Sequence, residues 1–207
     1  MNDQLTDPSE QFSVRAAIGG PLGVAESTLP FIVFTIVWAA NEREVVPAAV
    51  VAFGIAVVLA IARIARRQTV QFAISGAAGV ALAAFVASAT GRAEDFFLPG
   101  ILINAAGAIA YSISIAVRRP LIGLFVAQLT KEGPSWHEDP VHRRIYTRAS
   151  WIWVGLFCFR LSIQLPLYLS GEVAPLAVAR VVTGLPLFAL GVWLSYLLLK
   201  PILERPS

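Results

Sequence analysis

A succession of long apolar runs constrains this chain more than any other feature. The runs cover residues 24–40, 45–65, 70–90, 97–117, 149–169 and 173–199. A membrane span needs roughly 20 apolar residues, because the hydrocarbon core is about 30 Å thick and an α-helix rises about 1.5 Å per residue. We therefore expect an all-α fold, a polytopic transmembrane helical bundle with six spans.

The composition agrees with this prediction and sets the domain boundaries. Hydrophobic residues make up 57% of the 207-residue chain and charged residues 14%, whereas a soluble domain has about 45–50% and about 25%. We expect a polar N-terminal tail at 1–21, a transmembrane helical domain at 22–200 and a C-terminal tail at 201–207. The first apolar run follows a polar, acidic start without a basic leader, so we expect it to be retained.

The segment at 120–130 is apolar but has only 11 residues. A helix of that length covers about half of the hydrocarbon core, so it cannot span the membrane. Two readings stay open, a re-entrant helix and an interfacial helix at the membrane surface. In either case we expect it on the cytoplasmic side.

Basic residues indicate the orientation. Six spans put both termini on one side, and twelve of the 16 Lys and Arg residues fall on that side, against two on the other and two inside spans. The two on the opposite side are Arg43 and Arg92. By the positive-inside rule, we expect both termini of this multi-pass protein to lie in the cytoplasm. Because the basic residues lie beside apolar runs, nucleic acid is not an expected partner.

The loop between the fourth and fifth runs holds both histidines, His137 and His142, together with Glu138 and Asp139. These side chains can bind zinc or act as acid and base. Pro140 prevents a regular helix that would present both histidines together, which favours a solvated loop. The chain also lacks a nucleophile elbow and a glycine-rich phosphate loop. We therefore expect no catalytic residues, metal site or cofactor, and an enzyme using this loop is the weaker alternative.

Polar side chains inside the apolar runs are the best clue to function. They are Glu26, Asn104, Arg160, Gln164 and Arg180. A charge at the bilayer centre costs from about 2.5 to more than 10 kcal/mol, so each arginine needs a partner or water. Counting the helical rise from the outer ends, all but Glu26 fall in one outer-half layer. The hypothesis is a polar cavity that holds an anionic group such as a lipid phosphate; the alternative is a structural polar cluster satisfied by carbonyls and water.

The order of features resembles the intracellular septation protein A family of bacterial inner-membrane proteins. Three segments carry the resemblance: 29–34 (LPFIVF), 118–122 (RRPLI), and the Arg143-Arg144 pair before Trp151. The chain departs from that family's more uniformly apolar spans at Arg160 and Arg180. The resemblance implies a role in cell-envelope integrity or cell division. The rival function is that of a transporter or lipid-handling protein. Candidate partners are membrane lipids, envelope or division proteins, and a second copy of the chain.

Overall fold

The computed structural model describes residues 20–66, 70–130 and 139–203. These residues are helices and short connections, with no strand among them, which confirms the all-α prediction. The chain divides into two compact units, Met1–Phe96 and Phe97–Ser207.

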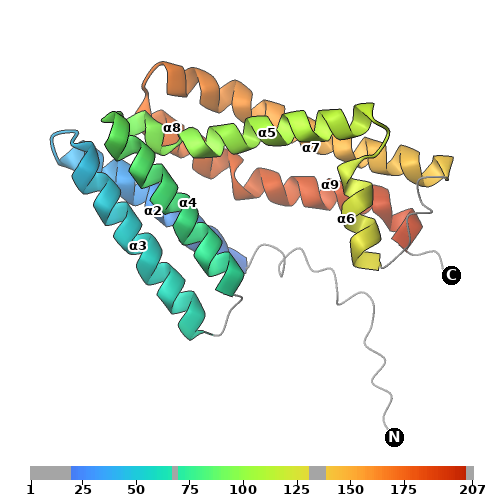
Figure 1. Cartoon of the computed structure of the whole chain (residues 1–207), viewed down its shortest axis with the longest axis horizontal. Helices are drawn as coiled ribbons and strands as arrows, with labels where there is room; N and C mark the ends of the chain where they lie inside the picture. Colours follow the sequence, from blue (N-terminus) through green and yellow to red (C-terminus); the bar gives the residue numbers. More distant parts are fainter. Residues whose placement is uncertain (1–19, 67–69, 131–138, 204–207) are drawn as a thin grey trace, which may run out of the picture. The chain divides into compact units, whose positions relative to one another are not determined.

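Unit 1 contains three long helices and one short turn of helix. They are α2 (Gly20–Ala40), α3 (Val45–Ala65), α4 (Val70–Thr90) and η2 (Ala93–Phe96). The second and third apolar runs predicted α3 and α4 to the residue. Helix α3 packs beside α2 on one side and α4 on the other (Figure 1).

Small side chains let the helices of unit 1 approach closely. The buried residues of α3 are all alanines, and Ala83 and Ala87 are buried in α4. Between transmembrane helices such residues allow backbone contact and dense van der Waals packing. A stack of Phe34 on Phe96, with ring centroids 3.9 Å apart and planes 2° apart, joins α2 to η2.

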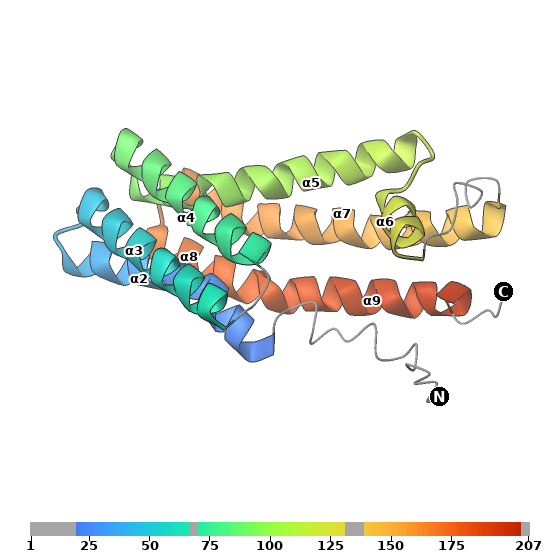
Figure 2. The same cartoon turned by 60° about the horizontal axis from the view of Figure 1, so that its bottom comes forward.

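Unit 2 is built on a long antiparallel pair, α5 (Leu98–Ala116) and α7 (Pro140–Leu169), which Figures 1 and 2 show side by side. The short helix α6 (Leu121–Thr130) packs on α7 through a core that includes Ile122, Val126 and Tyr146. The last helix, α9 (Leu185–Leu203), also packs on α7, where the Trp153 indole Nε1–H donates to Ser195 Oγ at 3.1 Å.

Helix α7 begins nine residues before the apolar run that predicted it. Asp139 caps the helix by accepting a hydrogen bond from the Val141 N–H at 2.7 Å, and Pro140 occupies the first turn, where its missing N–H costs nothing. The expectation of a loop as far as Arg148 is therefore wrong from Pro140 onward. His142 lies in the first turn of α7, whereas His137 lies outside the described residues.

The sixth apolar run is not one helix, contrary to expectation. It divides into α8 (Val173–Thr183) and α9, with Gly184 between them at φ −71° and ψ −101°. Pro186 has no N–H to donate to the preceding turn, and its ring excludes a regular helix through this point. The sequence Gly184-Leu185-Pro186 thus interrupts the run about midway.

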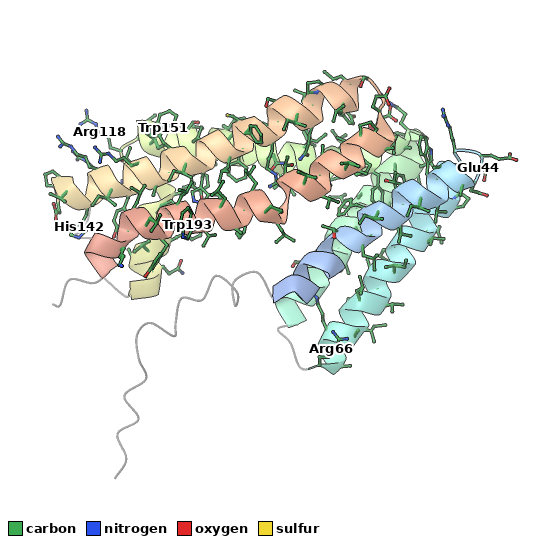
Figure 3. All side chains as sticks on the ribbon, turned by 180° about the vertical axis from the view of Figure 1, so that it is seen from behind. Glu44, Arg66, Arg118, His142, Trp151 and Trp193 are labelled. Atoms are coloured by element: carbon green, nitrogen blue, oxygen red, sulfur yellow. The ribbon has the colours of Figure 1, made fainter. Side chains whose placement is uncertain are left out.

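Four helical stretches in the described part of the chain are long and apolar enough to cross a membrane. They are Val45–Ala65, Leu98–Ala116, Pro140–Leu169 and the interrupted Val173–Lys200, and shorter apolar helices cover Thr28–Ala40 and Ser75–Thr90. Glu44 and Arg66 mark the opposite ends of α3 (Figure 3). The protein is therefore a membrane protein.

Candidate functional site

The face that α7 turns toward α5 changes from aromatic to polar along its length. Trp153, Phe157, Arg160 and Gln164 follow one another at helical spacing. Tyr111 of α5 contacts the first two rings, with centroid distances of 6.2 Å and 5.8 Å. The aromatic part of this face therefore establishes how α5 and α7 are aligned.

The alignment places the polar residues of the two helices at matching levels. A Cβ at Gly107 would lie 2.9 Å from the Phe157 ring, one turn along from the Tyr111 contact. Because the helices are antiparallel, the next turn brings Asn104 level with Arg160, and the turn after that brings Gly100 level with Gln164. Asn104 is buried, as is Gln164, which is 1% exposed.

A buried hydrogen bond joins α7 to α8. The Gln164 amide Nε2 donates to Thr183 Oγ1 at 3.0 Å, and the Thr183 hydroxyl donates to the Ala179 carbonyl at 2.7 Å. An amide N–H inside a membrane span needs such an acceptor, because hydrocarbon offers neither water nor any other acceptor in its place. The bond therefore holds α8 against the polar end of the α7 face.

Arg180 projects from α8 onto the backbone of α5. A Cβ at Gly100 would lie 2.7 Å from both the guanidinium carbon and Nη2, and closer still to Nη1. Van der Waals contact requires more than 3 Å, so only a residue without a side chain leaves room for the guanidinium in this position. Gly100 is therefore the seat of the Arg180 side chain.

Arg160 lies beside the break between α8 and α9. Its Nη2 is 3.8 Å from the Cβ position of Gly184, and the Arg180 carbonyl is 2.7 Å from the same point. The last carbonyls of a helix lack intrahelical partners and carry partial negative charge, which favours a cation at that end. The broken helix thus supplies one source of stabilisation for a guanidinium at membrane depth.

Arg160 nevertheless has one N–H group without a hydrogen-bond acceptor among the described residues. Its Nε is buried and has no hydrogen-bond acceptor among the described residues. Arg160 and Arg180 also act on each other as like charges, a repulsion that is stronger in a low-dielectric interior than in water. The site therefore has donor capacity and positive charge that suit an anionic ligand.

Four of the five polar residues predicted from the sequence lie in unit 2. Gln164 and Arg180 lie on contacting helices, α7 and α8, and Asn104 and Arg160 lie level with each other on α5 and α7. Glu26 lies in α2 of unit 1, and its side chain is outside the described part of the structure.

Sequence reasoning missed three contributors to the site: Gly100, Thr183 and Gly184. Thr183 follows Arg180 by three residues and so shares its face of α8, which is a readable signal. The Gly184-Leu185-Pro186 sequence is a second signal, because glycine and proline together favour a helix break. Gly100 gives no comparable signal, since its role depends on a side chain 80 residues away.

The described part of the histidine motif, Asp139 and His142, forms a small helix cap. The His142 ring Nδ1 pairs with the Asp139 carboxylate, whose other oxygen accepts the Val141 N–H. The hydrogen bond from the Val141 N–H is the main cause that holds the pKa of Asp139 below its ordinary value of 3.8. No group of three or more His, Cys, Asp or Glu side chains occurs among the described residues.

Comparison with known proteins gives one match. A family model described as "Protein of unknown function (DUF3159)" matches residues 18–206. No curated protein and no solved structure matches the chain. Since the family model covers nearly the whole sequence, the chain belongs to the family of proteins of unknown function DUF3159.

Proposed function

We propose that this protein binds an anionic group within the membrane, at the polar layer formed by α5, α7 and α8. The observation that carries the proposal is Arg160, a guanidinium in an apolar span with a buried Nε that lacks an acceptor among the described residues. A charged-group donor left unsatisfied in hydrocarbon is expensive, whereas a bound oxyanion would accept this hydrogen bond.

The neighbouring residues are of the kind that would complete such a site. Arg180 contributes a second guanidinium, seated on Gly100. Arginine binds phosphate and carboxylate oxygens through paired N–H donors, which gives orientation as well as charge. Asn104, level with Arg160, adds an uncharged polar group. A lipid phosphate or a small anionic cargo would fit this chemistry, as in a lipid-handling protein or a transporter. Discontinuous helices of the α8–α9 type recur at transporter sites.

The accompanying topology is six spans in the bacterial inner membrane with both termini in the cytoplasm. Helices α2 and α4, at 21 residues each, are long enough to join the four spans identified by length and composition. On this arrangement α6, with 10 residues, lies on the cytoplasmic side as a re-entrant or interfacial helix. An added cysteine at Glu94 should then react with an impermeant thiol reagent from outside the cell, and one at Arg118 should not.

The anion-binding proposal is tested by purifying the wild type and Arg160→Gln after detergent exchange. The wild type should retain an anionic molecule, identified by mass spectrometry of the denatured sample, and the variant should lose about tenfold or more of it. Arg66→Gln, which removes an exposed arginine from the end of α3 and lies in neither proposed site, serves as the matched control. Equal retention by Arg160→Gln and the wild type, with both proteins folded, would overturn the proposal.

A role in envelope integrity or cell division remains a proposal that rests on the resemblance to the septation protein A family alone. The match to a family of unknown function adds no activity to it. Deletion of the gene should then lengthen cells or sensitise them to envelope stress, and rescue by Arg160→Gln would separate this role from anion binding.

A further inference from the structure

One exposed face of α7 combines a basic end with an aromatic, membrane-facing continuation. Its members follow at steps of four, three, four and four residues, which keeps them on one side of the helix. They are Arg144, Arg148, Trp151, Gly155 and Phe159, and all five are exposed. We call this set the α7 outer stripe. The opposite side of the helix holds the buried residues Tyr146, Ala149 and Ser150.

The apolar part of the α7 outer stripe contains an open space. A Cβ built at Gly155 has no atom within 4 Å. Trp151 lies one turn before this glycine and Phe159 one turn after it, with 53% and 51% of their surfaces exposed. Two exposed rings therefore flank a position with no side chain, which leaves a shallow notch along a membrane-spanning stretch.

Two further arginines lie at the same end of unit 2 as Arg144 and Arg148. Arg118 and Arg119 follow Val117, the C-cap of α5, and both are exposed. By the antiparallel register Arg118 lies level with Tyr146 along the axis, but α5 packs on the side of α7 that faces away from the stripe. Arg118 and Trp151 accordingly appear at the same end of unit 2 (Figure 3).

The turn that carries these arginines has a defined backbone. Arg118 has a left-handed φ of 58°, a conformation that is unfavourable for any residue with a Cβ. Hydrogen bonds from the Arg118 N–H to the Ile115 carbonyl at 3.0 Å and from the Arg119 N–H to the Ser114 carbonyl at 2.9 Å hold it. The arginines are therefore attached to a fixed turn and not to a free loop.

We propose that the α7 outer stripe binds an anionic phospholipid. The lipid phosphate pairs with Arg144 and Arg148, and one acyl chain lies in the notch at Gly155 between Trp151 and Phe159. Charge complementarity selects an acidic headgroup. The aromatic notch suits a molecule that also has a hydrocarbon chain, which a free phosphate ester lacks. This site is separate from Arg160, which lies 12 residues or about 18 Å further along α7 than Arg148, and does not rest on the anion-binding proposal above.

The test uses the whole protein in nanodiscs of phosphatidylcholine with a minority of phosphatidylglycerol, followed by native mass spectrometry of the released complexes. Wild type should retain phosphatidylglycerol in preference to phosphatidylcholine. The double substitution Arg144→Gln/Arg148→Gln should lower phosphatidylglycerol retention about thirtyfold, from the loss of two arginine–headgroup attractions. Gly155→Leu, which fills the notch, should lower it about fourfold, as expected when contact with a single methylene is lost.

Matched controls separate this site from general basicity and from the buried arginines. The substitutions Arg63→Gln/Arg66→Gln remove two charges from the end of α3, and Gly54→Leu fills another glycine position with no atom within 4 Å. Both controls should retain phosphatidylglycerol as the wild type does, and adding Arg160→Gln should leave the loss caused by Arg144→Gln/Arg148→Gln unchanged. Equal retention of the two lipids by wild type, an equal loss in the α3 controls, or displacement of the lipid by soluble glycerol 1-phosphate would each overturn the proposal.

Discussion

The two units of this protein solve the problem of packing helices in a membrane in different ways. In unit 1 the buried surfaces of α3 and α4 consist mainly of alanine, and a stack of two phenylalanine rings joins α2 to η2. In unit 2 the corresponding contacts between α5, α7 and α8 include a buried amide, a hydroxyl and two guanidiniums. Small apolar side chains pack at little cost in hydrocarbon, while polar and charged groups are expensive there.

The contrast shows that the groups that are costly in hydrocarbon lie at the helix contacts of unit 2. A membrane bundle of this size does not need arginine to hold its helices together, as unit 1 demonstrates. The retention of two arginines in unit 2, one of them with a buried Nε that has no acceptor among the described residues, is the observation on which the anion-binding proposal rests. Four experiments follow, in order of decreasing expected effect.

Arg160→Met should stabilise the ligand-free protein by about 2 kcal/mol, because it replaces a poorly satisfied charge in the span with an apolar side chain. Chemical unfolding in detergent measures the change. Arg148→Met, an exposed position at the end of the same helix, should change stability by less than about 0.5 kcal/mol. Destabilisation by Arg160→Met would instead show that Arg160 has a structural role.

Alanine substitution of glycine should have different effects in the two units. Gly54→Ala in α3 should stabilise by up to about 1 kcal/mol, because its Cβ meets open space and alanine favours the helix. Gly100→Ala should lack this gain, because its Cβ would move the flexible end of the Arg180 side chain away from α5. Thermal midpoints of the two variants in the same detergent provide the measurement. If both variants gained stability, the seat of Arg180 on Gly100 would have no energetic importance.

The hydrogen bond between Gln164 and Thr183 should have a smaller effect. A double-mutant cycle with Gln164→Leu and Thr183→Val should give a coupling energy of about 0.6 kcal/mol, the usual size for interhelical hydrogen bonds in membranes. The pair Phe34→Leu and Gly54→Ala, which shares no contact, provides a cycle that should give no coupling. Additive effects of the Gln164 and Thr183 substitutions would contradict the bond.

The smallest effect concerns the exposed cap of α7. Since the pKa of Asp139 is lower in the folded protein than its ordinary value of 3.8, its contribution to stability is present above that ordinary value and is lost as the pH falls through the folded pKa. Asp139→Asn keeps a capping side chain but cannot titrate. The thermal midpoint of wild type should thus fall more than that of Asp139→Asn between neutral and strongly acidic pH. An equal fall in the two proteins would contradict the role of the Asp139 carboxylate as a cap.

Much of the fold could be predicted from the sequence, and the reason is local. The apolar runs at 45–65 and 70–90 define α3 and α4 to the residue, because the length of hydrocarbon and the rise of a helix set both ends. The extension of α7 to Pro140 also has a local cause. Asp139-Pro140 is a typical helix start, but the polar residues that follow it lie outside the apolar run that predicted the helix.

The candidate site also has one part that local sequence predicts and another that it does not. The sequence by itself determined that Asn104, Arg160, Gln164 and Arg180 lie inside apolar runs, since a polar residue at membrane depth is visible from its apolar neighbours on the chain. Only the tertiary structure decided that Arg180 rests on Gly100 and that Arg160 lies beside the break at Gly184. These contacts depend on the alignment of α5, α7 and α8, and that alignment is established by side-chain packing between helices that are distant in sequence, which no local pattern of residues encodes.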